Sequence, residues 1–111
     1  MGKRYSKKAT LEGVWVFVPD IWSNPSAIFS SRKGASEWIR NNRLTGILMK
    51  YPLDESVLDW VQRFGGCGHT TGELEEAGRN PSQKAKFISA ALIHYHFEDG
   101  KLHGTDWEHR F

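Results

Sequence analysis

The segment Val14–Val18, with the sequence VWVFV, constrains the fold more than any other part of this chain. Every residue in it is β-branched or aromatic, which favours a β-strand. Successive side chains of a strand point to opposite faces, so the three valines share one face and Trp15 and Phe17 share the other. Both faces are apolar. We therefore expect a central strand that is covered on both sides.

Shorter patterns predict the strands around it. Residues 27–29 are typical of a short second strand, and residues 44–51 of a third strand that ends before a proline. Apolar residues alternate with polar ones over residues 93–98, which predicts a fourth strand. Asp99 and Gly100 form a two-residue hairpin signal, so residues 101–103 are the expected return strand.

Helical spacing predicts three helices between these strands. The first follows one of the two serines at 30–31, either of which can cap it. The second has apolar residues at i, i+3, i+4 and i+7 over residues 57–64, and Asp54 is its expected N-cap. The third begins at Asn80-Pro81, with Phe87 on its inward face.

These elements follow the order ββαβααβ, with a fifth strand from the hairpin. We expect one α+β domain over residues 13–111, with a mixed sheet of four to five strands and about three helices. The chain has 111 residues, which leaves no room for a second domain. Residues 65–82 hold five glycines and no apolar periodicity, so we expect an excursion from the domain there.

Basic charge is concentrated at the start of the chain. Lys3, Arg4, Lys7 and Lys8 contribute +4, whereas the whole chain has a net charge of +2, so the remainder is acidic by two charges. Residues 1–12 predict a flexible basic arm. Its four cations are the candidate contacts to nucleic acid.

Within the domain, two neighbouring stretches have opposite charge. Residues 31–50 hold five basic residues and one acid, and residues 54–76 hold six acids and one arginine. Either the two stretches neutralise each other, or the acidic one is a face for a basic partner. The candidate partner contacts are the acids Asp54, Glu55, Asp59, Glu73, Glu75 and Glu76, with Trp22 and Trp107 as aromatic anchors.

His94 and His96 are the sharpest chemical candidates. On a strand they project from the same face, where two imidazoles can ligate Zn²⁺, and Cys67 and His69 can complete a four-ligand site. The spacing matches no well-attested zinc motif. Two other interpretations stay open: half-exposed histidines on a polar strand face, and a metal-free acid/base pair of a small ribonuclease.

The sequence lacks the signals of membrane-spanning and secreted proteins. No segment approaches 18 apolar residues, and no apolar segment follows the basic start, so we expect a cytoplasmic protein without a membrane span. The single cysteine fits a reducing compartment. Trp15 and Phe17 could stack on bases, but packing beneath a helix is the favoured interpretation.

Several of these segments together carry a resemblance. V-W-V-F-V at 14–18, F-S-S, E-W-I, Y-P-L-D, D-W and H-Y-H-F-E-D-G at 94–100 resemble a group of small uncharacterised bacterial proteins that share a domain of unknown function. The resemblance covers most of residues 13–100, and the glycine-rich stretch around Cys67 departs from the group's pattern. It implies no activity, although small bacterial domains of this size often serve as immunity proteins, antitoxins or other accessory binders.

Two hypotheses from different classes follow. The first is a non-enzymatic module that binds another protein, such as an immunity- or antitoxin-like inhibitor that acts by occlusion, without a cofactor and with a homodimer left open. The alternative is a nucleic-acid-binding or zinc-binding protein, or a small ribonuclease, that uses His94, His96 and the basic arm.

Overall fold

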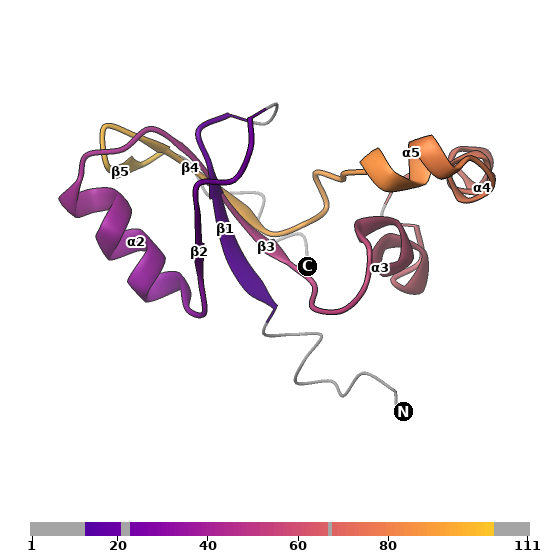
Figure 1. Ribbon diagram of the computed structural model, residues 1–111, viewed down its shortest axis with the longest axis horizontal. Helices are drawn as coiled ribbons and strands as arrows, with labels where there is room; N and C mark the ends of the chain where they lie inside the picture. The colour runs from indigo at the N-terminus through magenta and orange to yellow at the C-terminus, as the bar shows by residue number, and fades with distance from the viewer. Residues whose placement is uncertain (1–12, 21–22, 67, 104–111) are drawn as a thin grey trace.

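The computed structural model describes residues 13–20, 23–66 and 68–103, which form a five-stranded sheet flanked by helices (Figure 1). The strand order is β2-β1-β3-β4-β5, and all four neighbouring pairs are antiparallel. The α+β class, the five strands and the interior place of the first strand are confirmed, although the sheet is antiparallel throughout rather than mixed. The strands are β1 (Val14–Val18), β2 (Ala27–Phe29), β3 (Gly46–Tyr51), β4 (His94–Glu98) and β5 (Lys101–Leu102).

One face of the sheet is covered by α2 (Arg32–Asn41) (Figure 1). Ser31 caps this helix, because its side chain accepts a hydrogen bond from a backbone N–H in the first turn. Ile39 of α2 is fully buried in a core that also contains Trp15 and Phe17. These two aromatic residues therefore pack beneath a helix, as expected, and offer no platform for bases.

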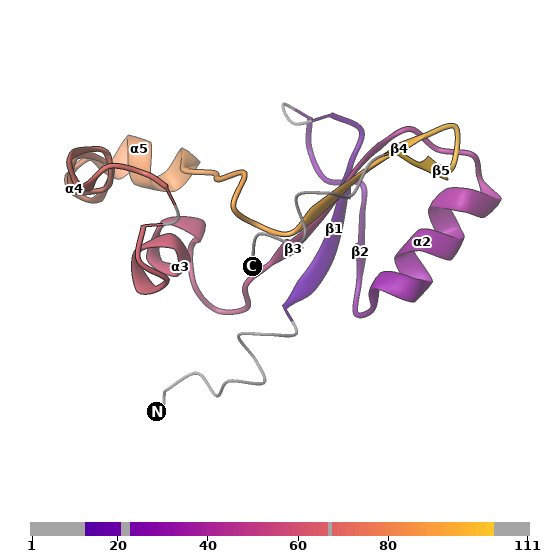
Figure 2. The same cartoon turned by 180° about the vertical axis from the view of Figure 1, so that it is seen from behind.

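The other helices lie on the opposite side of the sheet, as both cartoon views show (Figures 1 and 2). They are α3 (Val57–Arg63), α4 (Thr71–Arg79) and α5 (Pro81–Lys86). A second core joins them to the sheet through Met49 of β3. Within the described ranges, no helix is long and apolar enough to cross a lipid bilayer.

The helical side differs from the sequence prediction in three places. The glycine-rich stretch contains α4, which a capping box between Thr70 and Glu73 starts. Ser56, rather than Asp54, caps α3: its side-chain oxygen accepts a hydrogen bond from the Asp59 N–H. Asp54 lies before the cap and has a positive φ of 62°. The helix after Asn80 ends at Lys86, so Phe87, which was expected on its inward face, is the residue that follows the helix.

The β4–β5 hairpin packs against the C-terminal end of α2. Asp99 and Gly100 have φ angles of 52° and 80°, the two positive values that a tight hairpin turn of this kind requires, so the predicted turn is confirmed. The Gly100 N–H donates to the Leu44 carbonyl at 2.8 Å. This contact fixes the hairpin beside the helix and sets the width of the space between them.

Candidate functional sites

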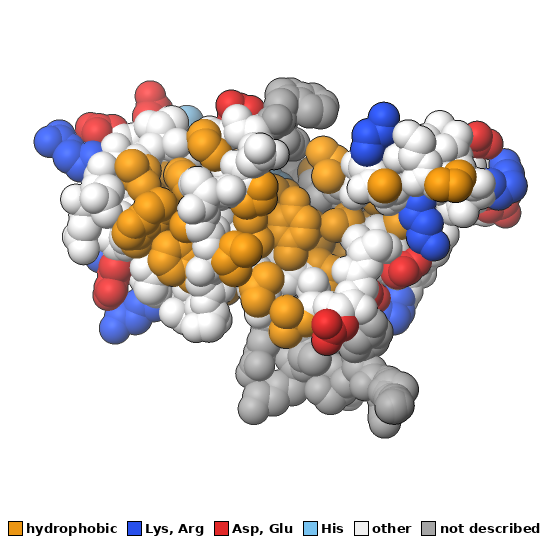
Figure 3. Space-filling view, viewed as in Figure 1, with side chains coloured by type: hydrophobic (Ala, Val, Ile, Leu, Met, Phe, Trp, Pro, Cys, Tyr) orange, Lys and Arg blue, Asp and Glu red, His pale blue; other side chains and the backbone are white. Residues whose placement is uncertain are grey.

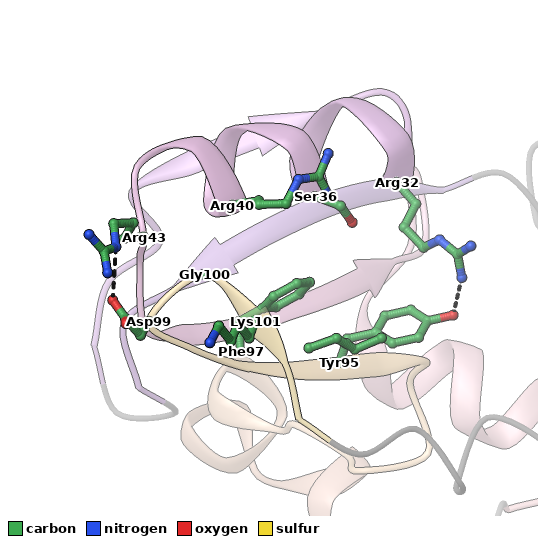
Figure 4. A pocket seen from close by; sticks show the side chains of 10 residues that line it. Arg32, Ser36, Arg40, Arg43, Tyr95, Phe97, Asp99, Gly100 and Lys101 are labelled. Atoms are coloured by element: carbon green, nitrogen blue, oxygen red, sulfur yellow. Dashed lines mark hydrogen bonds and ion pairs between the residues drawn. The ribbon is translucent and has the colours of Figure 1, made fainter.

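An open cleft of about 660 Å³ lies between α2 and the β4–β5 hairpin (Figure 4). We call it the basic cleft, because Arg32, Arg40, Arg43 and Lys101 line it together with a single carboxylate, that of Asp99. Tyr95 and Phe97 of β4 form its apolar wall. Four cations against one acid give the cleft a local excess of positive charge.

The arginines are positioned by the helix and by aromatic contacts. Arg32 and Arg40 are eight residues apart, with Ser36 midway, so all three lie along one side of α2 (Figure 4). The Arg32 guanidinium donates to the Tyr95 hydroxyl and lies 5.0 Å from the centre of the ring. The exposed pair Arg43–Asp99 is 3.5 Å apart, whereas Arg40 has no ion pair or side-chain hydrogen bond within the described residues.

Sequence reasoning detected the charge of this cleft but not the site. The excess of basic residues over residues 31–50 includes its three arginines. The opposite wall comes from residues 95–102, more than fifty positions later, and no local pattern connects the two segments. The basic cleft was therefore missed as a candidate site.

A second cavity, of about 330 Å³, lies on the opposite face of the sheet. We call it the histidine pocket, because His69, His94 and His96 line it among mainly apolar side chains of β1, β3 and the segment before β4. His94 and His96 share a face, as predicted, with ring centres 5.3 Å apart. Within the described residues, no group of three or more metal-ligating side chains has a geometry that could hold a metal ion.

The histidine pocket therefore contains three of the four predicted zinc ligands. Cys67, the fourth, lies outside the described residues, and zinc binding stays a prediction. The His94 Nδ1 is 2.8 Å from the Leu92 carbonyl oxygen. Because a carbonyl oxygen can only accept, this nitrogen carries a proton and donates the hydrogen bond.

Two side chains that line this pocket, His96 and Tyr51, have shifted pKa values. Burial, and then the nearby His94 and His103, lower the pKa of His96. Burial raises the pKa of Tyr51. Both side chains line the cavity, and perturbed titration is common at sites of function. Near neutral pH, His96 and Tyr51 are consequently uncharged.

The acidic stretch is partly neutralised within the domain. Glu55 pairs with Arg63 at 2.5 Å and its side chain is only 6 % exposed, while Glu76 pairs with Arg79 at 3.0 Å. Glu73 accepts the Thr70 N–H in the capping box. Figure 3 shows acidic and basic side chains next to each other over the end formed by α4 and α5. The expected contacts Asp54, Asp59 and Glu75 are exposed as well.

Trp22, Trp107 and the four basic residues of the arm, Lys3, Arg4, Lys7 and Lys8, lie outside the described residues.

The fold is a small α+β domain, with the basic cleft on one face of an antiparallel sheet and the histidine pocket on the other. The chain belongs to the family described as Domain of unknown function (DUF7710), which matches residues 14–103. The matched region includes every described strand and helix and the lining of both cavities. No curated protein and no solved structure matches the chain significantly.

Proposed function

We propose that this domain is a protein-binding module that holds an acidic segment of its partner in the basic cleft. The observation that carries the proposal is the gathering of three arginines and a lysine around one carboxylate, beside an aromatic wall. Guanidinium groups bind carboxylates through paired, charge-assisted hydrogen bonds, which makes arginine suited to such a partner.

The dimensions of the cleft suit a short extended segment. Arg32 and Arg40 are separated by eight helical residues, a distance of about 12 Å along the axis. An extended peptide covers that distance in about four residues. Both residues of β5, Lys101 and Leu102, line the cleft opposite the arginines of α2, so a bound segment contacts the hairpin on one side and the helix on the other.

Nucleic acid suits this cleft less well. The described residues contain ten basic and ten acidic side chains, so they carry no net positive charge to follow a long phosphate backbone. Tyr95 and Phe97 are 6 % and 7 % exposed, which leaves little ring surface for stacking on bases. These observations favour a compact acidic partner over a nucleic-acid strand.

The proposal reverses the charge of the expected partner: the sequence suggested a basic partner, and the basic cleft suits an acidic one. Because Glu55 and Glu76 are paired internally, the acidic stretch offers less open charge than its composition indicates. An immunity- or antitoxin-like inhibitor of bacterial origin, which occludes its target, is one form that such a module takes, and that role stays part of the proposal.

The test uses the full chain and a synthetic peptide of alternating glutamate and leucine. We expect the peptide to shift the backbone amide resonances of Arg40 and Lys101, with an affinity that falls as salt rises. Arg40→Gln should weaken binding about tenfold or more, because it removes a charge-assisted hydrogen bond. Lys33→Gln is the matched control: it removes the same charge from the same helix, outside the cleft.

Three outcomes would contradict the proposal. The first is that the peptide leaves these resonances unmoved, and the second is that both variants weaken binding equally. The third is that a single-stranded oligonucleotide occupies the basic cleft in preference to the peptide, which would favour the nucleic-acid hypothesis.

A further inference from the structure

Ser89 is a buried polar residue, with 5 % of its surface exposed, and it lines the histidine pocket. Its Oγ lies 3.0 Å from the His69 Nε2 and accepts the Ala91 N–H at 3.1 Å. Since the oxygen already accepts one hydrogen bond, its own proton is available to donate to the imidazole.

His69 is held in the orientation of a general base. Its Nδ1 is 3.6 Å from the Glu73 Oε1, slightly longer than a direct hydrogen bond. A carboxylate beside Nδ1 favours the tautomer with its proton there, which leaves Nε2 free to accept from Ser89.

Two further contacts fix this arrangement. The Thr70 N–H donates to the same Glu73 oxygen at 2.9 Å, and the Phe87 ring centre lies 5.2 Å from that of His69. A hydroxyl, an imidazole and a carboxylate thus follow one another in the order that activates a serine nucleophile.

We infer that Ser89, His69 and Glu73 form a hydrolytic site for esters of short apolar acids. The acyl group would occupy the histidine pocket, where Ile47, Met49 and Ile88 supply apolar lining within about 330 Å³. This activity goes beyond the proposed binding function, and it lies on the other face of the sheet from the basic cleft.

The reaction has two balanced steps. Ser89 Oγ attacks the ester carbonyl carbon while its proton passes to the His69 Nε2; the carbon–oxygen bond to the alcohol then breaks, and the alcohol leaves with that proton. Water next attacks the acyl–Ser89 ester, giving its proton to His69. The acid leaves, and the proton returns to Ser89 Oγ.

The pocket also contains a candidate donor for the carbonyl oxygen as it gains negative charge. His96 lines the same cavity, and its imidazole carries at least one N–H in either protonation state. Glu73 acts through His69 and is a positioning residue.

The test measures both labelling and turnover by the full chain. A fluorophosphonate probe should add its mass to Ser89, as located by peptide mass spectrometry, and p-nitrophenyl butyrate should be hydrolysed. His69→Gln should slow both reactions about a hundredfold or more. Glu73→Gln, which keeps an oxygen for the Thr70 N–H, should lower kcat with little change in KM.

The control is Ser82→Ala, an exposed serine of α5, which should change neither rate. Because the probe labels Ser89 in the unaltered chain, the test does not depend on a Ser89→Ala variant, which could fail to fold. The inference is overturned if the probe leaves Ser89 unmodified. It is equally overturned if labelling and hydrolysis persist undiminished in a His69→Gln variant with an unchanged circular dichroism spectrum.

Discussion

Replacing Gly100 by alanine tests whether the hairpin presses on the end of α2, the contact that sets one wall of the basic cleft. Gly100 has a φ of +80°, where an L-residue is strained by about 1–2 kcal/mol. Alanine also restricts the unfolded chain, which offsets about 0.4–1 kcal/mol. At the midpoints of these two ranges, the backbone contributes a net loss of about 0.8 kcal/mol.

Packing adds a larger loss at this position. A Cβ on residue 100 would lie 2.9 Å from the Arg43 Cα and 3.1 Å from the Arg40 carbonyl oxygen. Both neighbours are backbone atoms, which cannot rotate away, and overpacking of this kind costs about 1–3 kcal/mol. We expect Gly100→Ala to lower the free energy of unfolding by about 1.5–4 kcal/mol in total.

Gly65 provides a matched control. Its φ is +81°, nearly the same, and a Cβ there would meet nothing within 4 Å. Gly65→Ala should therefore show the backbone contribution alone, about 1 kcal/mol or less. Urea unfolding followed by tryptophan fluorescence measures both variants. If the two lose equal stability, the hairpin does not pack against α2, and the shape inferred for the basic cleft is wrong.

Three further predictions concern the core, a helix cap and pH. Leu48→Ala should lower the free energy of unfolding in urea by about 2–5 kcal/mol, because Leu48 is 0 % exposed. Asn80→Ala should cost about 1 kcal/mol and reduce helical circular dichroism, because the side chain accepts the Ser82 N–H at 2.9 Å. The folded-state pKa of His96 is lowered, so the unfolded chain binds its proton first, and stability should fall as pH drops below about 6.5. His96→Gln should flatten this part of a stability profile measured between about pH 7.5 and about pH 5.5.

The elements that sequence predicted well are those with strong local signals. β1 was predictable because five consecutive β-branched or aromatic residues leave few alternatives to a buried strand. The tight hairpin followed from Asp99-Gly100, and the start of α5 from Asn80-Pro81. In each case the determining interaction joins residues that are neighbours along the chain.

The elements that sequence missed depend on weak or distant signals. α4 buries only Leu74 and Ala77, too few apolar residues to reveal helical spacing among glycines. Its capping box, Thr70 with Glu73, was the local signal that could have located it. Ser89 and His69 are twenty residues apart, so only the packing of α4 and α5 brings them together.

The alternation of β4 distributes its residues between the two sites. Tyr95 and Phe97 face the basic cleft, and His94 and His96 face the histidine pocket. A one-residue slip against β3 would exchange these sets. Gly46 lies opposite Phe97 in the observed register, and on its other side it fits closely against β1, because a Cβ there would lie 2.5 Å from the Phe17 ring. The register of β4 therefore controls both sites, while substitutions on its alternate residues should perturb them separately.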